Sequence, residues 1–393
     1  MWSNYPEILK IWISRSRNHG FSFIVGWTIG NERFLGDYDT AAIGATIDVL
    51  VQNCAKWQSI SVDAQLEAPG NFMNQILSVI PQGKAKIQQI CVDRAEFAID
   101  KLFTFPLVHL THLTIYTYAR NYPIRSYALM ENLLSLSLSA NNFDIMRLLS
   151  QAPRLRRAKL HVKLAPGEAY PSASIAMTYL HTLDLKVAAG AGEDTPDVLD
   201  PRFCRFLGCL CLPALKTLFI DIGGGDARPL RWSGVVDLLL RSEASLENLE
   251  MRSFAIASFT QFLEGLPDLK HLAITDPILI QDEKLICRLI YDPLPSTNVH
   301  ARLCQNLESL RITCPIFGST GLRFLLRSVI DVSTFEGART LVLVVPNGTE
   351  ISGLQSLPPG SSLKIVKDWD WKVQRKDLYE EFGANWWNTE LQS

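Results

Sequence analysis

The sequence lacks an excess of either charge, any long apolar run and any sign of export. Its 38 Lys and Arg residues nearly balance 40 Asp and Glu residues, for a net charge of -2. This balance gives no electrostatic reason to expect nucleic acid or an anionic membrane as the main partner. No run reaches the roughly 18 consecutive apolar residues of a membrane span. Glu7 and Lys10 interrupt the early apolar run, so no signal peptide is indicated and a cytoplasmic or nuclear location is expected.

The sequence also lacks the spacing of a metal or disulfide framework. Its eight cysteines are scattered, and no pair has the two-residue spacing of a zinc knuckle. Cys209-Leu210-Cys211 lies in apolar text typical of a helix. We therefore expect free, mostly buried thiols. His109 and His112 are three residues apart, which on a strand places them on opposite faces, so no metal site is predicted.

Motifs of catalysis are missing as well. Gly223-Gly224-Gly225 is not followed by Gly-Lys-Ser or Gly-Lys-Thr, so a turn is favoured over a phosphate loop. There is no Gly-x-Ser-x-Gly sequence and no carboxylate pair in a setting that would tune a general acid. We expect no enzymatic activity, no catalytic residues and no cofactor.

What the sequence has is a repeated apolar triplet: apolar, two spacers, apolar, one spacer, apolar. Copies begin 22 to 38 residues apart, which brackets the leucine-rich-repeat period and exceeds it where loops are inserted. The copies are Trp57/Ile60/Val62, Ile87/Ile90/Val92, Leu110/Leu113/Ile115, Leu133/Leu136/Leu138, Leu155/Ala158/Leu160, Leu180/Leu183/Leu185, Leu215/Leu218/Ile220, Leu246/Leu249/Met251, Leu269/Leu272/Ile274, Leu307/Leu310/Ile312 and Ala338/Leu341/Leu343.

The triplet has a physical reading. Alternate side chains of a strand face opposite sides, so the fourth and sixth places face a core while the third, fifth and seventh face outward. Three buried residues contribute roughly 5 to 9 kcal/mol, whereas ordering some 25 backbone residues costs about 25 to 50 kcal/mol. One repeat cannot fold alone, so neighbouring repeats must stack. The prediction is one α/β leucine-rich-repeat solenoid, an arc or horseshoe with a parallel inner sheet and outer helices.

Segments with the apolar periodicity of helices separate the predicted strands, and the N- and C-terminal segments of the chain depart from the repeat. Apolar runs typical of helices cover 143–149, 203–210, 235–240, 259–266 and 322–329, several of them ending just before a proline. Polar, Gly- and Pro-rich surface loops are expected at 165–174, 188–200, 223–231 and 278–299. We divide the chain into an N-terminal helix-strand-helix cap (1–56, with helices over 6–16 and 40–53 and a strand over 21–27), the repeat array (57–366) and a C-terminal aromatic and charged cap (367–393).

Outward strand places would line a binding surface. An ordinary solvated strand face is the alternative for any one of these residues. Tyr116 and Phe219 are expected to be exposed aromatic anchors. The candidate partner-binding residues are Tyr116, Arg157, Lys159, His161, Asp184, Lys186, Phe219, Asp221, Glu250, Arg252 and Arg311.

The N-terminal residues resemble a known family. Trp2-Ser3, Trp12-Ile13-Ser14-Arg15-Ser16, the strand Phe21-Ser22-Phe23-Ile24-Val25 and Lys56-Trp57 before Ile60-Ser61-Val62 are similar to the region after the F-box in mushroom-type fungal F-box proteins with leucine-rich repeats. That resemblance implies a substrate receptor of a cullin-RING ubiquitin ligase, whose repeats hold the target. The F-box, which in the family docks the ligase adaptor, would lie upstream of Met1.

Two functions therefore stay open. The first is a monomeric protein-binding scaffold that corresponds to the target-holding part of such a receptor, and the adaptor is a partner only if an F-box precedes this segment. The second is a structural or assembly protein that packs permanently against another subunit.

Overall fold

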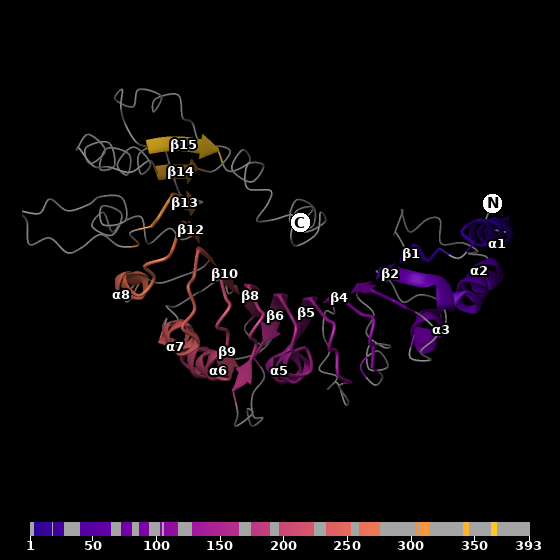
Figure 1. The fold of residues 1–393 in the computed structure, drawn as a ribbon, viewed down its shortest axis with the longest axis horizontal. Helices are drawn as coiled ribbons and strands as arrows, with labels where there is room; N and C mark the ends of the chain where they lie inside the picture. Colours follow the sequence, from indigo (N-terminus) through magenta and orange to yellow (C-terminus); the bar gives the residue numbers. More distant parts are fainter. Residues whose placement is uncertain are drawn as a thin grey trace, which may run out of the picture. The chain divides into compact units, whose positions relative to one another are not determined.

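The structure, a computed structural model, has mixed α/β architecture in which parallel strands are flanked by helices (Figure 1). Its contacts fall into two compact units, which we describe separately. The N-terminal unit comprises Met1–Leu215 with Asp237–Ala244, and the C-terminal unit comprises Lys216–Val236 with Ser245–Ser393. The structure describes residues 4–17, 19–26, 40–63, 72–80, 86–93, 103, 106–116, 128–164, 174–188, 196–223, 233–252, 259–275, 304, 306–313, 341–345 and 363–367.

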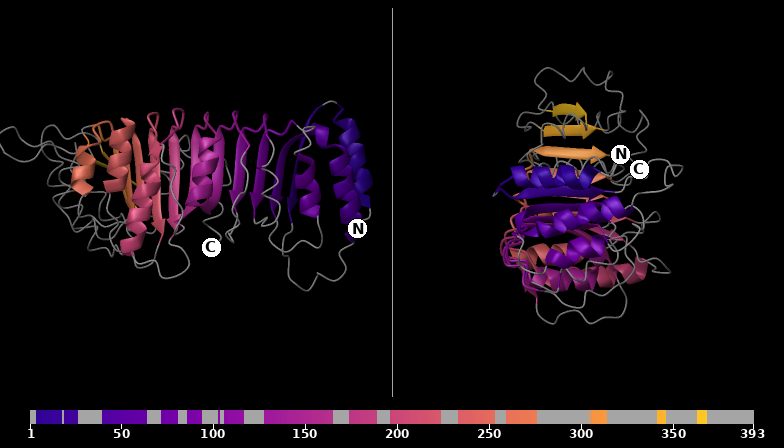
Figure 2. Two further views of the ribbon diagram at one scale, coloured as in Figure 1. Left: turned by 90° about the horizontal axis from the view of Figure 1, so that it is seen from below. Right: turned by 90° about the vertical axis from the view of Figure 1, so that its right-hand side faces the viewer.

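The N-terminal unit contains a parallel sheet in the order β1-β2-β3-β4-β5-β6-β8, with its helices on one face (Figures 1 and 2). A separate two-stranded parallel pair joins β7 to β9. The elements are α1 (Tyr5–Arg15), β1 (Phe21–Gly26), α2 (Thr40–Gln52), the 3-10 turn η3 (Cys54–Lys56), β2 (Trp57–Asp63), α3 (Phe72–Val79), β3 (Gln89–Asp93), β4 (His112–Tyr116), β5 (Ser135–Asn141), α5 (Asn142–Ser150), β6 (Arg157–Lys163), β7 (Ile175–Ala176), β8 (Thr182–Ala188), α6 (Pro196–Gly208) and β9 (Leu210–Cys211).

The C-terminal unit has the same strand arrangement, with parallel strands in the order β10-β11-β12-β13-β14-β15. Helix α7 (Ser233–Ser242) begins in residues assigned to this unit and ends in residues assigned to the N-terminal one. The other elements are β10 (Thr217–Gly223), β11 (Asn248–Arg252), α8 (Phe259–Glu264), β12 (His271–Thr275), β13 (Ser309–Thr313), β14 (Leu341–Val345) and β15 (Leu363–Lys367).

The apolar triplets are aligned across the strands, as predicted. In the N-terminal unit Leu113 pairs with Leu136, which pairs with Ala158, so fourth places meet fourth places. In the C-terminal unit Leu249 pairs likewise with Leu272. These side chains are at most 2 % exposed. The inward positions of these paired strands therefore form a continuous apolar row. Stacking of neighbouring repeats thus stabilises strands that could not fold singly.

One triplet is assigned two residues out of step. Leu310 pairs with Leu343, not with Leu341, so the fourth place of β13 meets the predicted sixth place of β14. The period-2 alternation of Leu341-Val342-Leu343-Val344-Val345 fits either choice, because a shift of two residues keeps the same side chains on the same face. The assignment Ala338/Leu341/Leu343 is wrong in register although the strand is where it was predicted.

Strands β4, β5, β6, β8, β11, β12 and β13 each start at a backbone carbonyl that accepts two hydrogen bonds. The carbonyl oxygen of Thr111, at the second place of its triplet, accepts from the N–H groups of Leu134 and Ser135, and that of Leu134 accepts from Arg156 and Arg157. The same pattern recurs from Lys216 and Glu247 in the C-terminal unit. The two backbone N–H groups at the start of each of these strands are therefore satisfied, which fixes the register at its first residue.

Most helices lie where the apolar periodicity predicts them. Asn141 caps α5, its side-chain oxygen accepting from the N–H of Asp144 at 2.8 Å, and Pro153 follows the helix. Two local predictions are wrong. Part of the expected loop at 188–200 belongs to α6, which begins at Pro196, a residue that suits a first helical turn. Leu210, expected in a helix, lies in β9, because Cys209 and Cys211 carbonyls accept from Ile175 and Met177. The predictions at 322–329, 278–299 and 368–393 fall outside the described residues.

Candidate protein-binding surface

The third, fifth and seventh places of the strands form a surface that we call the outward face. On β6 the burial alternates without exception, with half-buried Arg157, Lys159, His161 and Lys163 separated by fully buried residues. Helix α5 packs on the other side of β5 and β6, where its apolar residues are buried. The outward face of these strands is therefore the side that the helices leave uncovered.

Basic side chains gather on β6 and β8. Arg157, Lys159 and Lys163 follow one another at alternate positions of β6, and the register places exposed Lys186 beside His161. Asp184, paired with Lys159, is 8 % exposed. The structure thus brings together Arg157, Lys159, His161, Asp184 and Lys186 of the predicted set, and adds Lys163, which sequence reasoning missed although it lies on the same alternation.

The pKa of the His161 imidazole is lowered by its position in this cluster. Burial lowers its pKa first, and the ammonium groups of Lys186, Lys163 and Lys159 lower the pKa further. Its Nδ1 lies 3.3 Å from the hydroxyl of Ser139 on β5. Burial also lowers the pKa of His112 on β4, with the Arg157 guanidinium as the second cause. Both rings are therefore held toward the neutral form at pH 7.

The two aromatic candidates differ in exposure. Tyr116, at the outward end of β4, is 37 % exposed, as expected. Phe219 on β10 is 9 % exposed, so the prediction that it is an exposed anchor is wrong. Adjacent strands lie about 4.8 Å apart, and Phe219 pairs with Glu250 of β11, which is itself 7 % exposed. The alternation of strand positions predicted the side of the sheet on which Phe219 lies, but not the burial of its ring.

The remaining candidates lie on the outward places of the C-terminal unit. Half-buried Asp221 pairs with Arg252 across β10 and β11. Arg311 pairs with Ala273, and so lies on the row that also holds Glu250. The side chains of Arg252 and Arg311 are outside the described part of the chain. That the predicted residues of either unit hold a partner stays a prediction.

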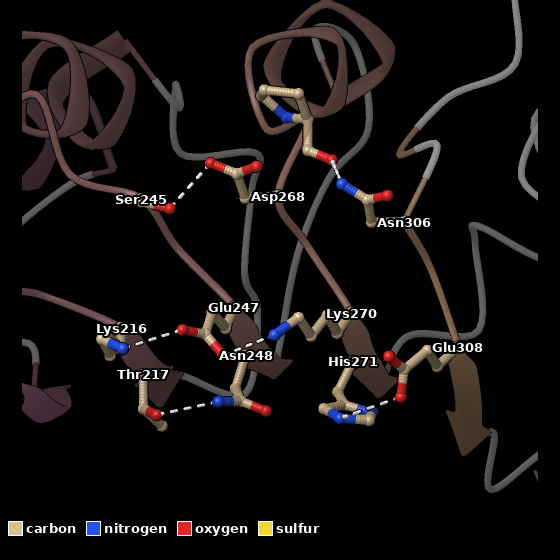
Figure 3. A network of polar contacts seen from close by, with 11 residues as sticks. Lys216, Thr217, Ser245, Glu247, Asn248, Asp268, Lys270, His271, Asn306 and Glu308 are labelled. Carbon is tan, nitrogen blue, oxygen red and sulfur yellow. Dashed lines mark hydrogen bonds and ion pairs between the residues drawn. The ribbon is translucent and has the colours of Figure 1, made fainter.

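A polar ladder crosses the start of β10, β11 and β12 (Figure 3). The Glu247 carboxylate receives Lys216 on one oxygen and Lys270 on the other, each at 3.0 Å. These hydrogen bonds, that of Lys270 first, lower the pKa of Glu247. One place further along, the amide of Asn248 donates to the hydroxyl of Thr217 at 3.0 Å. The sequence signal was the order Lys, Glu, Lys, Glu at the second place of successive triplets.

A serine, a histidine and a carboxylate also meet in the C-terminal unit. His271 Nδ1 lies 2.7 Å from Ser309 Oγ, and its Nε2 lies 4.0 Å from Glu308 (Figure 3). Ser309 is only 3 % exposed, and a substrate carbonyl could not approach a hydroxyl at that depth. The cluster reads as a polar link between β12 and β13.

Helix α1 carries an unexpected apolar surface. Ile13 and Pro6 are buried against the unit, whereas Tyr5, Ile8, Ile11 and Trp12 are 48 %, 52 %, 51 % and 72 % exposed. Their spacing of three and four residues places them along one side of the helix. The sequence predicted this helix and its apolar residues, but could not tell which side packs.

The described thiols agree in part with the sequence prediction. In the described part of the chain Cys54, Cys91, Cys204, Cys209, Cys211 and Cys304 are not in disulfides, but only three of the six are buried, where most were expected to be. Burial raises the pKa of the Cys209 thiol. Among the described residues, no group of three His, Cys, Asp or Glu side chains is placed to hold a metal ion, and no helix is both long and apolar enough to cross a membrane.

Neither models of known protein families nor curated proteins match this chain when compared with it.

Proposed function

We propose that this chain is an intracellular leucine-rich-repeat scaffold that binds another protein on its outward face, and that it corresponds to the target-holding part of an F-box receptor of a cullin-RING ubiquitin ligase. The observation that carries the scaffold is the strand-by-strand register, which lines up charged and polar side chains from β4 to β8 on the side away from the helices. The receptor role is supported by the N-terminal resemblance to the mushroom-type F-box family.

Repeat length and pattern support the leucine-rich class. A triplet whose first, fourth and sixth residues are buried, followed by a helix that packs on the side these residues face, is the unit of that class. Leu155, Ala158 and Leu160 are at most 1 % exposed, and β6 then leads to the next strand of the sheet. Stacked units of this kind offer long, rigid surfaces, and such surfaces serve mainly in protein recognition.

A second candidate, a permanently assembled subunit, is favoured by one observation. The exposed side of α1, with Tyr5, Ile8, Ile11 and Trp12, is the kind of clustered apolar surface that marks a lasting interface. In this version the constant partner covers α1 and the outward face is secondary.

Site-specific photo-crosslinking tests the scaffold. A crosslinking residue replaces Tyr116 on the outward face, Trp12 on α1 or Arg147 on the exposed side of α5. The proposal expects one identified protein to be crosslinked from Tyr116 and not from Arg147, and the purified pair to re-form. Reversing Arg157 and Lys159 to Glu should weaken this capture without lowering the melting temperature. Crosslinking confined to Trp12 would favour the assembly subunit instead.

The ligase role needs its own test. The complete gene product, including any sequence upstream of Met1, is co-expressed with the ligase adaptor. Co-purification that depends on an upstream helical segment with Leu-Pro near its start supports the receptor. A product that begins at Met1 and retains its target but not the adaptor supports a scaffold without ligase function.

A further inference from the structure

The outward face of β6 presents cations at a regular interval. Arg157, Lys159 and Lys163 occupy the third, fifth and ninth places of the repeat. At the seventh place the cation comes from the next strand, because Lys186 is the register partner of His161. Three of the four alternate places on β6 therefore carry a Lys or Arg, and beside the remaining place, His161, the cation lies on the neighbouring strand.

Within β4, β5, β6 and β8 this line carries a net positive charge. Among the described outward positions of β4, β5, β6 and β8, Asp184 is the only carboxylate, and one carboxylate cannot neutralise four cations whatever contacts it makes. The neighbouring places of β5 carry short, uncharged side chains: Ser135, Ser137, Ser139 and Asn141, each paired with a residue of β6. The whole chain is slightly acidic, so this line is a local exception.

The interval matches one class of ligand. Alternate residues of a strand are about 6.6 Å apart, and the same distance separates alternate side chains of any extended peptide lying alongside it. A peptide with carboxylates at every second position would meet a cation at each step over roughly 20 Å. A peptide crossing the strands would meet them at about 4.8 Å and lose this match.

We propose that the outward face of β6, completed by Lys186, binds an extended acidic segment of a partner protein whose Asp or Glu residues occupy alternate positions. The proposal rests on the protein-binding function above and specifies the chemistry of the segment. Neutral His161, between the lysines, accommodates the segment without adding a fixed charge. Specificity comes from the spacing of the carboxylates and not from their number.

Single-stranded nucleic acid is the competing polyanion, and the surface fits it poorly. Such sites combine a basic track with several aromatic rings on which bases stack. On the described outward places of β4 to β8, Tyr116 is the aromatic residue. Stacking would thus be limited to a single position at the edge of the track.

Fluorescence anisotropy with the full chain tests the inference. The probes are two labelled peptides of equal composition, Glu-Ser-Glu-Ser-Glu-Ser-Glu and Glu-Glu-Glu-Glu-Ser-Ser-Ser. The variant is Lys159→Glu with Lys186→Glu. The matched control, Arg147→Glu with Lys86→Glu, changes the net charge equally at exposed positions away from the track. Circular dichroism verifies that both fold.

The alternating peptide should bind several-fold more tightly than the blocked one. The track variant should lose affinity on the order of tenfold or more, while the control keeps it. Equal binding of the two peptides, or equal loss in both variants, overturns the inference. So does tighter binding of an oligothymidylate or of phosphatidylserine-containing vesicles. If Tyr116 crosslinks a partner whose binding is unchanged by the track variant, the inference fails and the scaffold function stands. If the two peptides discriminate but no protein is crosslinked from Tyr116, the scaffold function fails, and the track keeps only its preference for alternating carboxylates.

Discussion

The hydroxyl oxygen of Ser242 accepts a hydrogen bond from the backbone N–H of Leu212 at 2.8 Å, although the two residues are 30 positions apart. Both residues are at most 2 % exposed. Beside them, the Arg241 guanidinium donates to the carbonyls of Leu207 and Leu210. The end of α7 thus supplies hydrogen-bond partners to backbone groups from the last turn of α6 to the residue after β9.

Ser242→Ala should destabilise the protein by about 1 to 3 kcal/mol, because it leaves the buried N–H of Leu212 without an acceptor. The urea unfolding midpoint measures the change. Ser245→Ala is the matched control: Ser245 is exposed and donates to Asp268, so its loss should be within about 0.5 kcal/mol. Equal effects of the two substitutions would contradict the role of Ser242.

Leu183→Asp should unfold the N-terminal unit, since it places a charge in a core position that is 1 % exposed. Loss of the cooperative thermal transition in circular dichroism is the expected result. Thr114→Asp, a half-buried outward place on β4, should keep the transition. A folded Leu183→Asp protein would show that the fourth place does not face the core.

Glu247→Gln should remove a stabilisation that depends on pH. Since Lys270 and Lys216 lower the pKa of Glu247 in the folded state, the contribution is complete at neutral pH. It is lost as the pH falls below roughly 4, the ordinary glutamate range, and through the depressed folded pKa. Wild type and variant should therefore differ in urea midpoint at pH 7 and converge in acid. The substitution Glu131→Gln, at an exposed position, is the charge-matched control. A difference in urea midpoint between wild type and Glu247→Gln that grows in acid would contradict the prediction.

Glu243→Gly should stabilise the end of α7. Glu243 has φ 50°, in the left-handed region, and Ala244 N–H donates to Leu239 carbonyl across it at 3.3 Å, as in a helix-terminating motif that favours glycine. Glycine removes the clash between Cβ and the backbone but loses more conformational entropy on folding. The net gain in the free energy of unfolding is roughly 0.5 kcal/mol. Glu243→Ala keeps the clash and should give no gain. A stabilised alanine variant would point to the carboxylate instead of the backbone.

Lys186→Met should raise the pKa of His161, because Lys186 is the first of the three lysines that lower it. The change is measured by following the imidazole resonances through an NMR pH titration. Lys86→Met, an exposed residue before β3, should leave the His161 titration where it is. An unchanged pKa in the Lys186 variant would mean that its ammonium group points away from the ring.

The sequence predicted on which side of the sheet the candidate residues lie, but not how deeply their side chains are buried. Alternation alone assigns Arg157, Lys159 and His161 to the outward side, and the structure agrees. The burial of Phe219 and Glu250 was not predictable, because it depends on register partners 31 residues apart in sequence. The pairing of Glu247 with two lysines was visible as an alternating charge pattern only once the strands were known to be neighbours.

By itself the sequence determined the strands, their inward residues and most helices, because a strand's two faces and a helix's apolar stripe are local consequences of backbone geometry. Tertiary structure decided the register of β14, since a shift of two residues leaves the same side chains on each face, and the strand β9, which exists through hydrogen bonds to β7. It also decided that Tyr5, Ile8, Ile11 and Trp12 remain exposed. Those outcomes depend on which distant segment lies alongside, and a local pattern carries no information about that neighbour.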